Sequence, residues 1–136
     1  MPHTVRVTFH GVGPTARPVP ADEQAVWLDV PQFERALDEL APLERTLVTF
    51  DDGNLSDLEV AAPRLAERGL AGAFYVCGGR IGSPGFLSAR DLRELRDQGF
   101  VVGSHGMDHV EWRGLPAKRP DAEGAGVDVH ERRVRD

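Results

Sequence analysis

The sequence has a single cysteine, Cys77, among its 136 residues. An intrachain disulfide is therefore excluded, which agrees with a reducing compartment. Long hydrophobic runs are also missing, because no apolar stretch is long enough to span a bilayer. The first residues show no basic segment followed by an apolar one, as a secretory signal peptide would. These absences together predict a cytoplasmic protein.

Positive charge is scarce as well. The chain has 16 Lys and Arg against 22 Asp and Glu, which gives a formal net charge of -6 and an isoelectric point near 5.3. This balance argues against nucleic acid or an anionic membrane as the main partner. The length suits one domain with a real hydrophobic core and is too short for two.

Two adjacent carboxylates, Asp51 and Asp52, form the most informative feature of the chain. They follow a short run, residues 46–50, that is apolar and β-branched and therefore predicts a buried strand. The carboxylates would then lie at the C-terminal end of a strand, where parallel α/β proteins place their chemistry. Two like charges side by side repel each other, and a bound cation is the simplest means of keeping both ionised.

Candidate partners for such a cation are His105 and His109, which follow a second short apolar run at residues 100–102. If this segment forms a helical turn, the i, i+4 spacing places both imidazoles on one face. Together with Asp52 they would make a metal site of two histidines and one carboxylate. An isolated HxxxH is a weak signal, because exposed or capping histidines produce it too. A pair of acids at the same predicted sheet edge makes it much stronger.

The segments TFDDG and HxxxH together resemble the first two motifs of the NodB-type polysaccharide deacetylases, or carbohydrate esterase family 4, whose fold is a distorted (β/α) barrel. The resemblance implies that Asp51 is the general base. It also implies that Asp52, His105 and His109 bind a divalent metal, usually zinc. One departure is Gly106, which stands where the family commonly has Ser or Thr.

The resemblance covers roughly residues 5–115 and then stops. The family's later motifs, Arg-x-Pro and the Leu-x-His that supplies the general acid, have no convincing match, and His130 is the only downstream candidate for the acid. Residues 116–136 are rich in charge, Pro, Gly and Ala without a sustained period, so we expect a disordered tail. We therefore expect residues 1–115 to be the front half of a deacetylase domain, ended by truncation, domain splitting or a shifted reading frame, which could leave it inactive alone.

The order of elements predicts an α/β fold with a parallel sheet. Strands are expected at residues 5–9, 46–50, 71–77 and 100–102, and helices at 31–40, at 55–68 and after a capping box at 88–91. Strands that alternate with helices form βαβ units. A closed (β/α)₈ barrel needs about 250 residues, so this chain supports only part of one. The uncovered sheet edges invite self-association or a partner chain.

Several other residues are candidates beside this edge. His10 follows the first strand; opening a glycine-rich turn is the interpretation that we weigh more heavily than a role in the site. Gly53 and Asn54 are candidates for supporting the site or contacting substrate, and Asn54 could also cap the following helix, as could Ser56. Trp27 suits packing better than a sugar-binding cleft.

Three functions compete on this sequence. The first is a metal-dependent hydrolase that removes N-acetyl groups from a carbohydrate. The second is a remnant of that fold that binds metal or carbohydrate without catalysis. The third is a small α/β domain whose acids cap a helix and whose histidines are incidental. Cys77, near the same edge, fits a buried hydrophobe better than a catalytic thiol, since no matching base is apparent.

Overall fold

A computed structural model of the chain describes residues 3–109. The predicted boundary near residue 115, the expected disorder of residues 116–136 and His130 lie outside this range. No helix within the described part is both long and apolar enough to cross a membrane.

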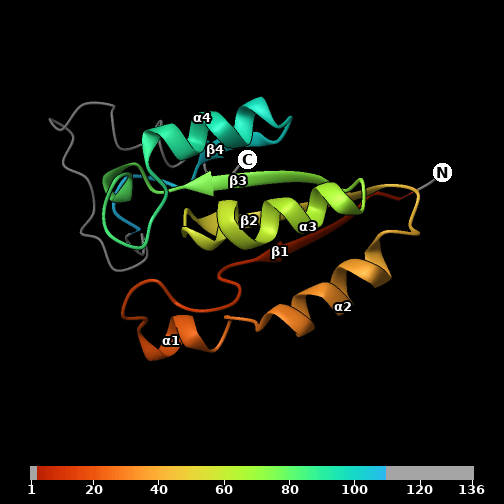
Figure 1. Cartoon of the computed structure of the whole chain (residues 1–136), viewed down its shortest axis with the longest axis horizontal. Coiled ribbons are helices and arrows are strands. Elements are labelled where there is room, and N and C mark those ends of the chain that lie inside the picture. The colour runs from red at the N-terminus through yellow and green to blue at the C-terminus, as the bar shows by residue number, and fades with distance from the viewer. Residues whose placement is uncertain (1–2, 110–136) are drawn as a thin grey trace, which may run out of the picture.

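Four parallel strands form one sheet in the order β1-β2-β3-β4 (Figure 1). They are β1 (Val5–Phe9), β2 (Thr46–Asp52), β3 (Ala71–Val76) and β4 (Val101–Ser104). The predicted parallel sheet is thereby confirmed. The main difference is at β2, which runs two residues beyond the expected end because Asp51 and Asp52 pair with Tyr75 and Val76 of β3. Both carboxylates therefore belong to the strand itself.

Helices connect the strands, as the sequence periodicity predicts. They are α1 (Ala21–Gln24), α2 (Val30–Leu40), α3 (Ala62–Glu67) and α4 (Ala89–Asp97), with a π-helical turn η1 (Asp57–Ala61) before α3 and a 3₁₀ turn η2 (Gly78–Arg80). The predicted capping box at Ser88 is confirmed: its side chain accepts a hydrogen bond from the Asp91 amide, and Asp91 accepts one from the Ser88 amide. A second box joins Asp29 and Gln32 at the start of α2.

Two local expectations are wrong. The proline-rich residues 13–23 predict an irregular surface loop, but residues 21–24 form a short helix. The helix expected from residue 55 begins with η1, and no side-chain cap closes its start. Ser56 occupies the cap position, but its hydroxyl accepts a long hydrogen bond from the Val12 amide, 3.3 Å. A tertiary contact has thus replaced the local one.

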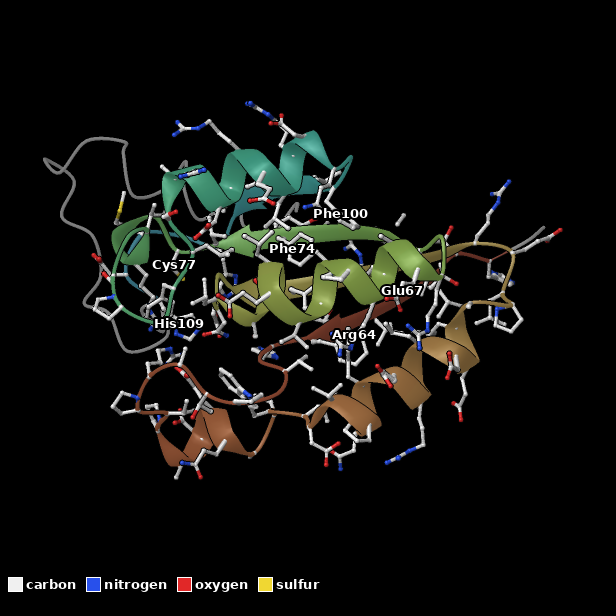
Figure 2. All side chains as sticks on the ribbon, in the orientation of Figure 1. Arg64, Glu67, Phe74, Cys77, Phe100 and His109 are labelled. Carbon is white, nitrogen blue, oxygen red and sulfur yellow. The ribbon has the colours of Figure 1, made fainter. Side chains whose placement is uncertain are left out.

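The core lies on one face of the sheet, beneath α2, α3 and α4 (Figures 1 and 2). A row of phenylalanine rings crosses it with successive centroids 4.8 to 6.0 Å apart, formed by Phe9, Phe33, Phe50, Phe74 and Phe100. Since side chains alternate along a strand, the neighbours of Phe50 and Phe74 point to the opposite face. That second face carries Thr49, Asp51 and Tyr75.

Candidate active site

Asp52, His105 and His109 meet at the C-terminal end of the sheet. Oδ1 of Asp52 lies 3.3 Å from Nε2 of His105 and 3.0 Å from Nε2 of His109. One ligand atom from each residue lies within 4.8 Å of the other two. The structure therefore brings together the three side chains that the sequence predicts as ligands, although β3 separates the strands that carry them.

The backbone around Asp52 is unusual. Asp52 has φ 84° and Gly53 has φ 77°, a left-handed conformation that non-glycine residues rarely adopt. A Cβ on Gly53 would lie 3.0 Å from side-chain atoms of Val76, so this position requires glycine for space as well as for conformation. The Asp52 side chain is 3% exposed. The turn thus holds a buried carboxylate against the two imidazoles.

The HxxxH segment reaches the site without forming the helical turn that its spacing suggests. The loop bends instead at Gly106, with φ 85°, and at His109, with φ 54°. Amides of Gly78 and Gly79 donate to the carbonyls of Gly106 and Met107 at 2.9 and 2.8 Å. The glycine at 106, where the family commonly has Ser or Thr, therefore matches a backbone conformation that disfavours a side chain.

The electrostatics of Asp52 favour its ionised form. Burial opposes ionisation, but interaction with His105 and the nearby His109 and His10 outweighs burial and holds the pKa of Asp52 below its ordinary value. Oδ1 is buried and makes no hydrogen bond of acceptable geometry with any residue in the 3–109 range. One carboxylate oxygen and two imidazole nitrogens thus converge, and with both nitrogens deprotonated they could hold a cation.

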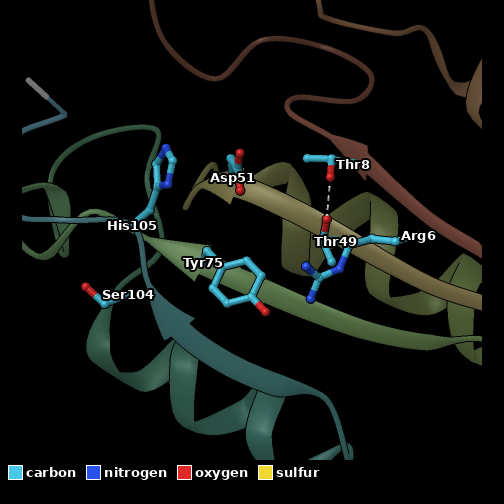
Figure 3. A pocket seen from close by; sticks show the side chains of 7 residues that line it. All are labelled: Arg6, Thr8, Thr49, Asp51, Tyr75, Ser104 and His105. Carbon is cyan, nitrogen blue, oxygen red and sulfur yellow. Dashed lines mark hydrogen bonds between the residues drawn. The ribbon is translucent and has the colours of Figure 1, made fainter. Parts of the chain in front are cut away.

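Asp51 faces the other side of β2 and borders a pocket of about 200 Å³ (Figure 3). The pocket is lined by Arg6, Thr8, Thr49, Asp51, Tyr75, Ser104 and His105. Hydroxyl groups dominate this lining, and those of Thr8 and Thr49 are 2.7 Å apart. Nε2 of His10 lies 3.9 Å from Oδ2 of Asp51, so the structure places His10 beside the acid rather than leaving it only in a turn.

The remaining candidates lie around this centre without joining the ligand trio. Asn54 is 1% exposed and its side chain accepts a hydrogen bond from Arg17. Trp27 is half-buried, and its indole donates to the Gly13 carbonyl at 2.8 Å, as expected for a packing role. Cys77 is 1% exposed, as predicted for a buried hydrophobe, and Figure 2 shows Cys77 and His109 at the same end of the sheet.

The sequence patterns do not single out Asp57 as a buried acid near the site. It is fully buried, and neither carboxyl oxygen has a hydrogen-bond partner among residues 3–109. Burial, with the negative charges of Asp52 and Asp51, raises its pKa well above the ordinary value. The available signal was a third acid close behind the pair, at the start of a predicted helix, where it resembles an ordinary first-turn acid.

Comparison with known proteins agrees with this fold. A family model described as polysaccharide deacetylase matches residues 42–127, and the chain belongs to that family. The putative polysaccharide deacetylase YxkH of Bacillus subtilis (strain 168) is 32% identical over 79 residues, which are 58% of this chain and 28% of YxkH. The predicted family resemblance is thereby confirmed, and the aligned residues make up less than a third of this relative.

Solved structures show the same fold. The deacetylase PplD of Streptococcus pyogenes, determined in complex with acetate, has a TM-score of 0.66 and 17% identity, covering 85% of this chain and 62% of PplD. IcaB of Ammonifex degensii has a TM-score of 0.65 and 21% identity, covering 96% of this chain and 67% of IcaB. The predicted α/β architecture of the NodB type is confirmed, with the described residues forming a four-stranded part of it.

Proposed function

We propose that this chain carries the metal-binding and base-catalytic part of a hydrolase that removes N-acetyl groups from a carbohydrate. The observation that supports it most directly is the convergence of Asp52, His105 and His109 beside Asp51. Family membership supports the reaction class, because PplD and YxkH are named as deacetylases. The chain spans only part of these relatives, so its own activity and substrate belong to the proposal.

Asp52, His105 and His109 would hold the divalent ion. Two imidazoles and one carboxylate suit zinc, and three protein ligands leave a coordination position open. When bound, such an ion polarises an amide carbonyl and lowers the pKa of a water molecule. The buried, unsatisfied Oδ1 of Asp52 is the feature of this chain that fits the ion best.

Asp51 is the proposed general base. Its carboxylate borders the pocket together with His105, so a water molecule near the ligand trio would lie within its reach. The imidazole of His10, whose Nε2 lies 3.9 Å from Oδ2 of Asp51, would orient the Asp51 carboxylate. The hydroxyls of Thr8, Thr49 and Tyr75 could exchange hydrogen bonds with the hydroxyls of a sugar.

The competing proposal is a remnant that binds metal or carbohydrate without catalysis. It is favoured by one observation: within the described residues, no side chain is identified that would protonate the departing amine. The two proposals differ in acetate release, which only the enzyme would show. The enzyme and a metal-binding remnant require the same metal site, whereas a carbohydrate-binding remnant does not.

The test measures zinc affinity by calorimetry and acetate release from a chitooligosaccharide, using the purified full chain. The wild type should bind about one zinc ion. Asp52→Asn should lose binding, whereas Asp51→Asn should retain zinc and lose acetate release. Zinc binding without acetate release by the wild type would favour the remnant, and absence of specific zinc binding would contradict both the enzyme and a metal-binding remnant.

A further inference from the structure

Arg17 connects the loop before α1 with the turn that follows the acidic pair. Its Nη2 donates to Oε2 of Glu23 at 2.6 Å and to Oδ1 of Asn54 at 2.8 Å. Its guanidinium carbon lies 4.3 Å from the centre of the Phe86 ring. The Arg17 side chain is only 10% exposed, which is rare for a surface-loop arginine. Such a buried position, in which one nitrogen donates to two residues, indicates a specific structural task.

The turn that Arg17 contacts is already joined to residues 85–87. The Leu87 amide donates to the Gly53 carbonyl at 2.9 Å, and the Leu55 amide donates to the Gly85 carbonyl at 3.0 Å. Asn54 and Phe86 form an isolated antiparallel bridge. Residues 53–55 and 85–87 thus form one hydrogen-bonded unit, which we call the clamp. Arg17 contacts both of its segments, since it donates a hydrogen bond to the side chain of Asn54 and stacks on the ring of Phe86.

Gly85 shows how closely the guanidinium arm is packed into this clamp. A Cβ on Gly85 would lie 2.6 Å from Cβ of Arg17, and Gly85 has φ 83°. The fit is thus made by the backbone of residue 85 as well as by polar groups. Arg17 occupies a shaped site rather than an open surface.

The clamp begins in the Asp52–Gly53 turn, so it can hold the backbone conformation of that turn. Asp52 holds a left-handed conformation, which persists only where the surrounding structure imposes it. Nδ2 of Asn54 is buried without a hydrogen-bond partner among the described residues. The hydrogen bond from Arg17 therefore fixes the side-chain amide of Asn54, two residues from the proposed ligand Asp52.

We propose that Arg17 is a positioning residue for the metal site. It holds Asn54 against residues 85–87, and through Asn54 it keeps the Asp52–Gly53 turn in the conformation that directs Asp52 to His105 and His109. This inference rests on the proposed metal site. It adds a residue from the first loop, outside both sequence motifs, to the support of that site.

The first experiment compares zinc affinity in variants of the full chain. Arg17→Met keeps an apolar arm over Phe86 and loses the hydrogen bonds. Loss of a residue that orients a ligand typically weakens metal binding by about 10- to 100-fold, and we expect a loss in this range. The matched control is Arg64→Met on α3, which removes a 2.9 Å contact with Glu34 away from the site and should leave zinc affinity unchanged.

A second variant tests the same hydrogen bond independently, in case Arg17→Met does not fold. Asn54→Leu removes the same hydrogen bond from the other partner and leaves the Arg17–Glu23 pair in place. It should weaken zinc binding to a similar degree, and combining it with Arg17→Met should add little further loss, because the two changes remove one shared interaction. Equal losses in Arg17→Met and Arg64→Met, or no loss in either Arg17→Met or Asn54→Leu, would overturn the proposal.

Amide hydrogen exchange in the metal-free protein separates this inference from the proposed function. The amides of Leu55 and Leu87 should exchange faster in Arg17→Met than in the wild type, and they should be unchanged in Arg64→Met. If the wild type binds no zinc, the proposed metal site fails, yet faster exchange at these amides would still show that Arg17 holds the turn. Unchanged exchange would show that it does not.

Discussion

At the scale of single residues, the pKa values of two nearby acids, Asp52 and Asp57, are shifted in opposite directions. The pKa of Asp52 is lowered, because nearby histidines outweigh its burial. The pKa of Asp57 is raised, because complete burial is joined by the charges of Asp52 and Asp51. One acid is suited to hold a cation, whereas the other carries its proton to higher pH than an exposed aspartate does.

The raised pKa of Asp57 predicts a specific pH dependence of stability. In the unfolded chain this carboxyl titrates at about 3.9. The folded protein keeps the extra proton above that pH, so stability should fall as the pH rises from there through the folded-state pKa. Asp57→Asn should therefore raise the melting temperature at neutral pH, and the gain should shrink toward pH 4.

The measurement is thermal unfolding across this pH range in chelator-treated buffer. Asp22→Asn, at an exposed position on α1, is the control and should change the melting temperature little. A gain from Asp57→Asn that stayed constant across the range would show that the carboxyl does not titrate differently on folding.

At the scale of elements, the loop after β4 replaces the helical turn expected from its spacing. Its conformation depends on Gly106 and on bonds from the two glycines of η2. Among residues 3–109, no atom lies within 4 Å of a Cβ built on Gly106. The demand for glycine there is therefore conformational rather than steric.

Gly106→Ser tests this loop, because it restores the residue type common in the family. We expect a loss of about 1–3 kcal/mol in the free energy of unfolding, since serine would be held at positive φ. The control is Gly69→Ser, where φ is 63° and no atom lies within 4 Å either. Both should lose stability in urea denaturation, but only Gly106→Ser should also weaken zinc binding. Wild-type zinc affinity in Gly106→Ser would show that the loop tolerates a side chain there.

The sequence predicts those elements whose cause is local. The strands, the capping box at Ser88 and the ligand trio follow from apolar runs, short motifs and the rule that parallel strands end at one edge. The π-helical turn and the bend at Gly106 do not, because tertiary contacts decide them. No spacing rule links Arg17 to Asn54, and no local signal separates the buried Asp57 from an exposed first-turn acid.

At the scale of the whole molecule, the proposed ligands tie together strands that are not neighbours in the sheet. Asp52 ends β2, whereas His105 and His109 follow β4. A bound ion would therefore link these two strands across β3. Only the folded chain presents all three ligands together, so binding should stabilise the fold as a whole.

Zinc should raise the melting temperature of the chain. At a free concentration 100 times the dissociation constant, a ligand specific for the folded state adds about 2.7 kcal/mol, which corresponds to roughly 10 °C for a domain of this size. The rise should disappear after chelation and in Asp52→Asn. A similar rise in Asp52→Asn would mean that zinc binds elsewhere.

The middle strand has a further consequence for how the site is assembled. Val76 pairs with Asp52 on one side, and its carbonyl accepts the His105 amide at 2.8 Å on the other. Because adjacent strands are separated by about 4.8 Å, β3 acts as a spacer that contributes no ligand and sets the separation of those that do. Zinc binding by all three residues therefore requires that β2 and β4 are both docked on β3.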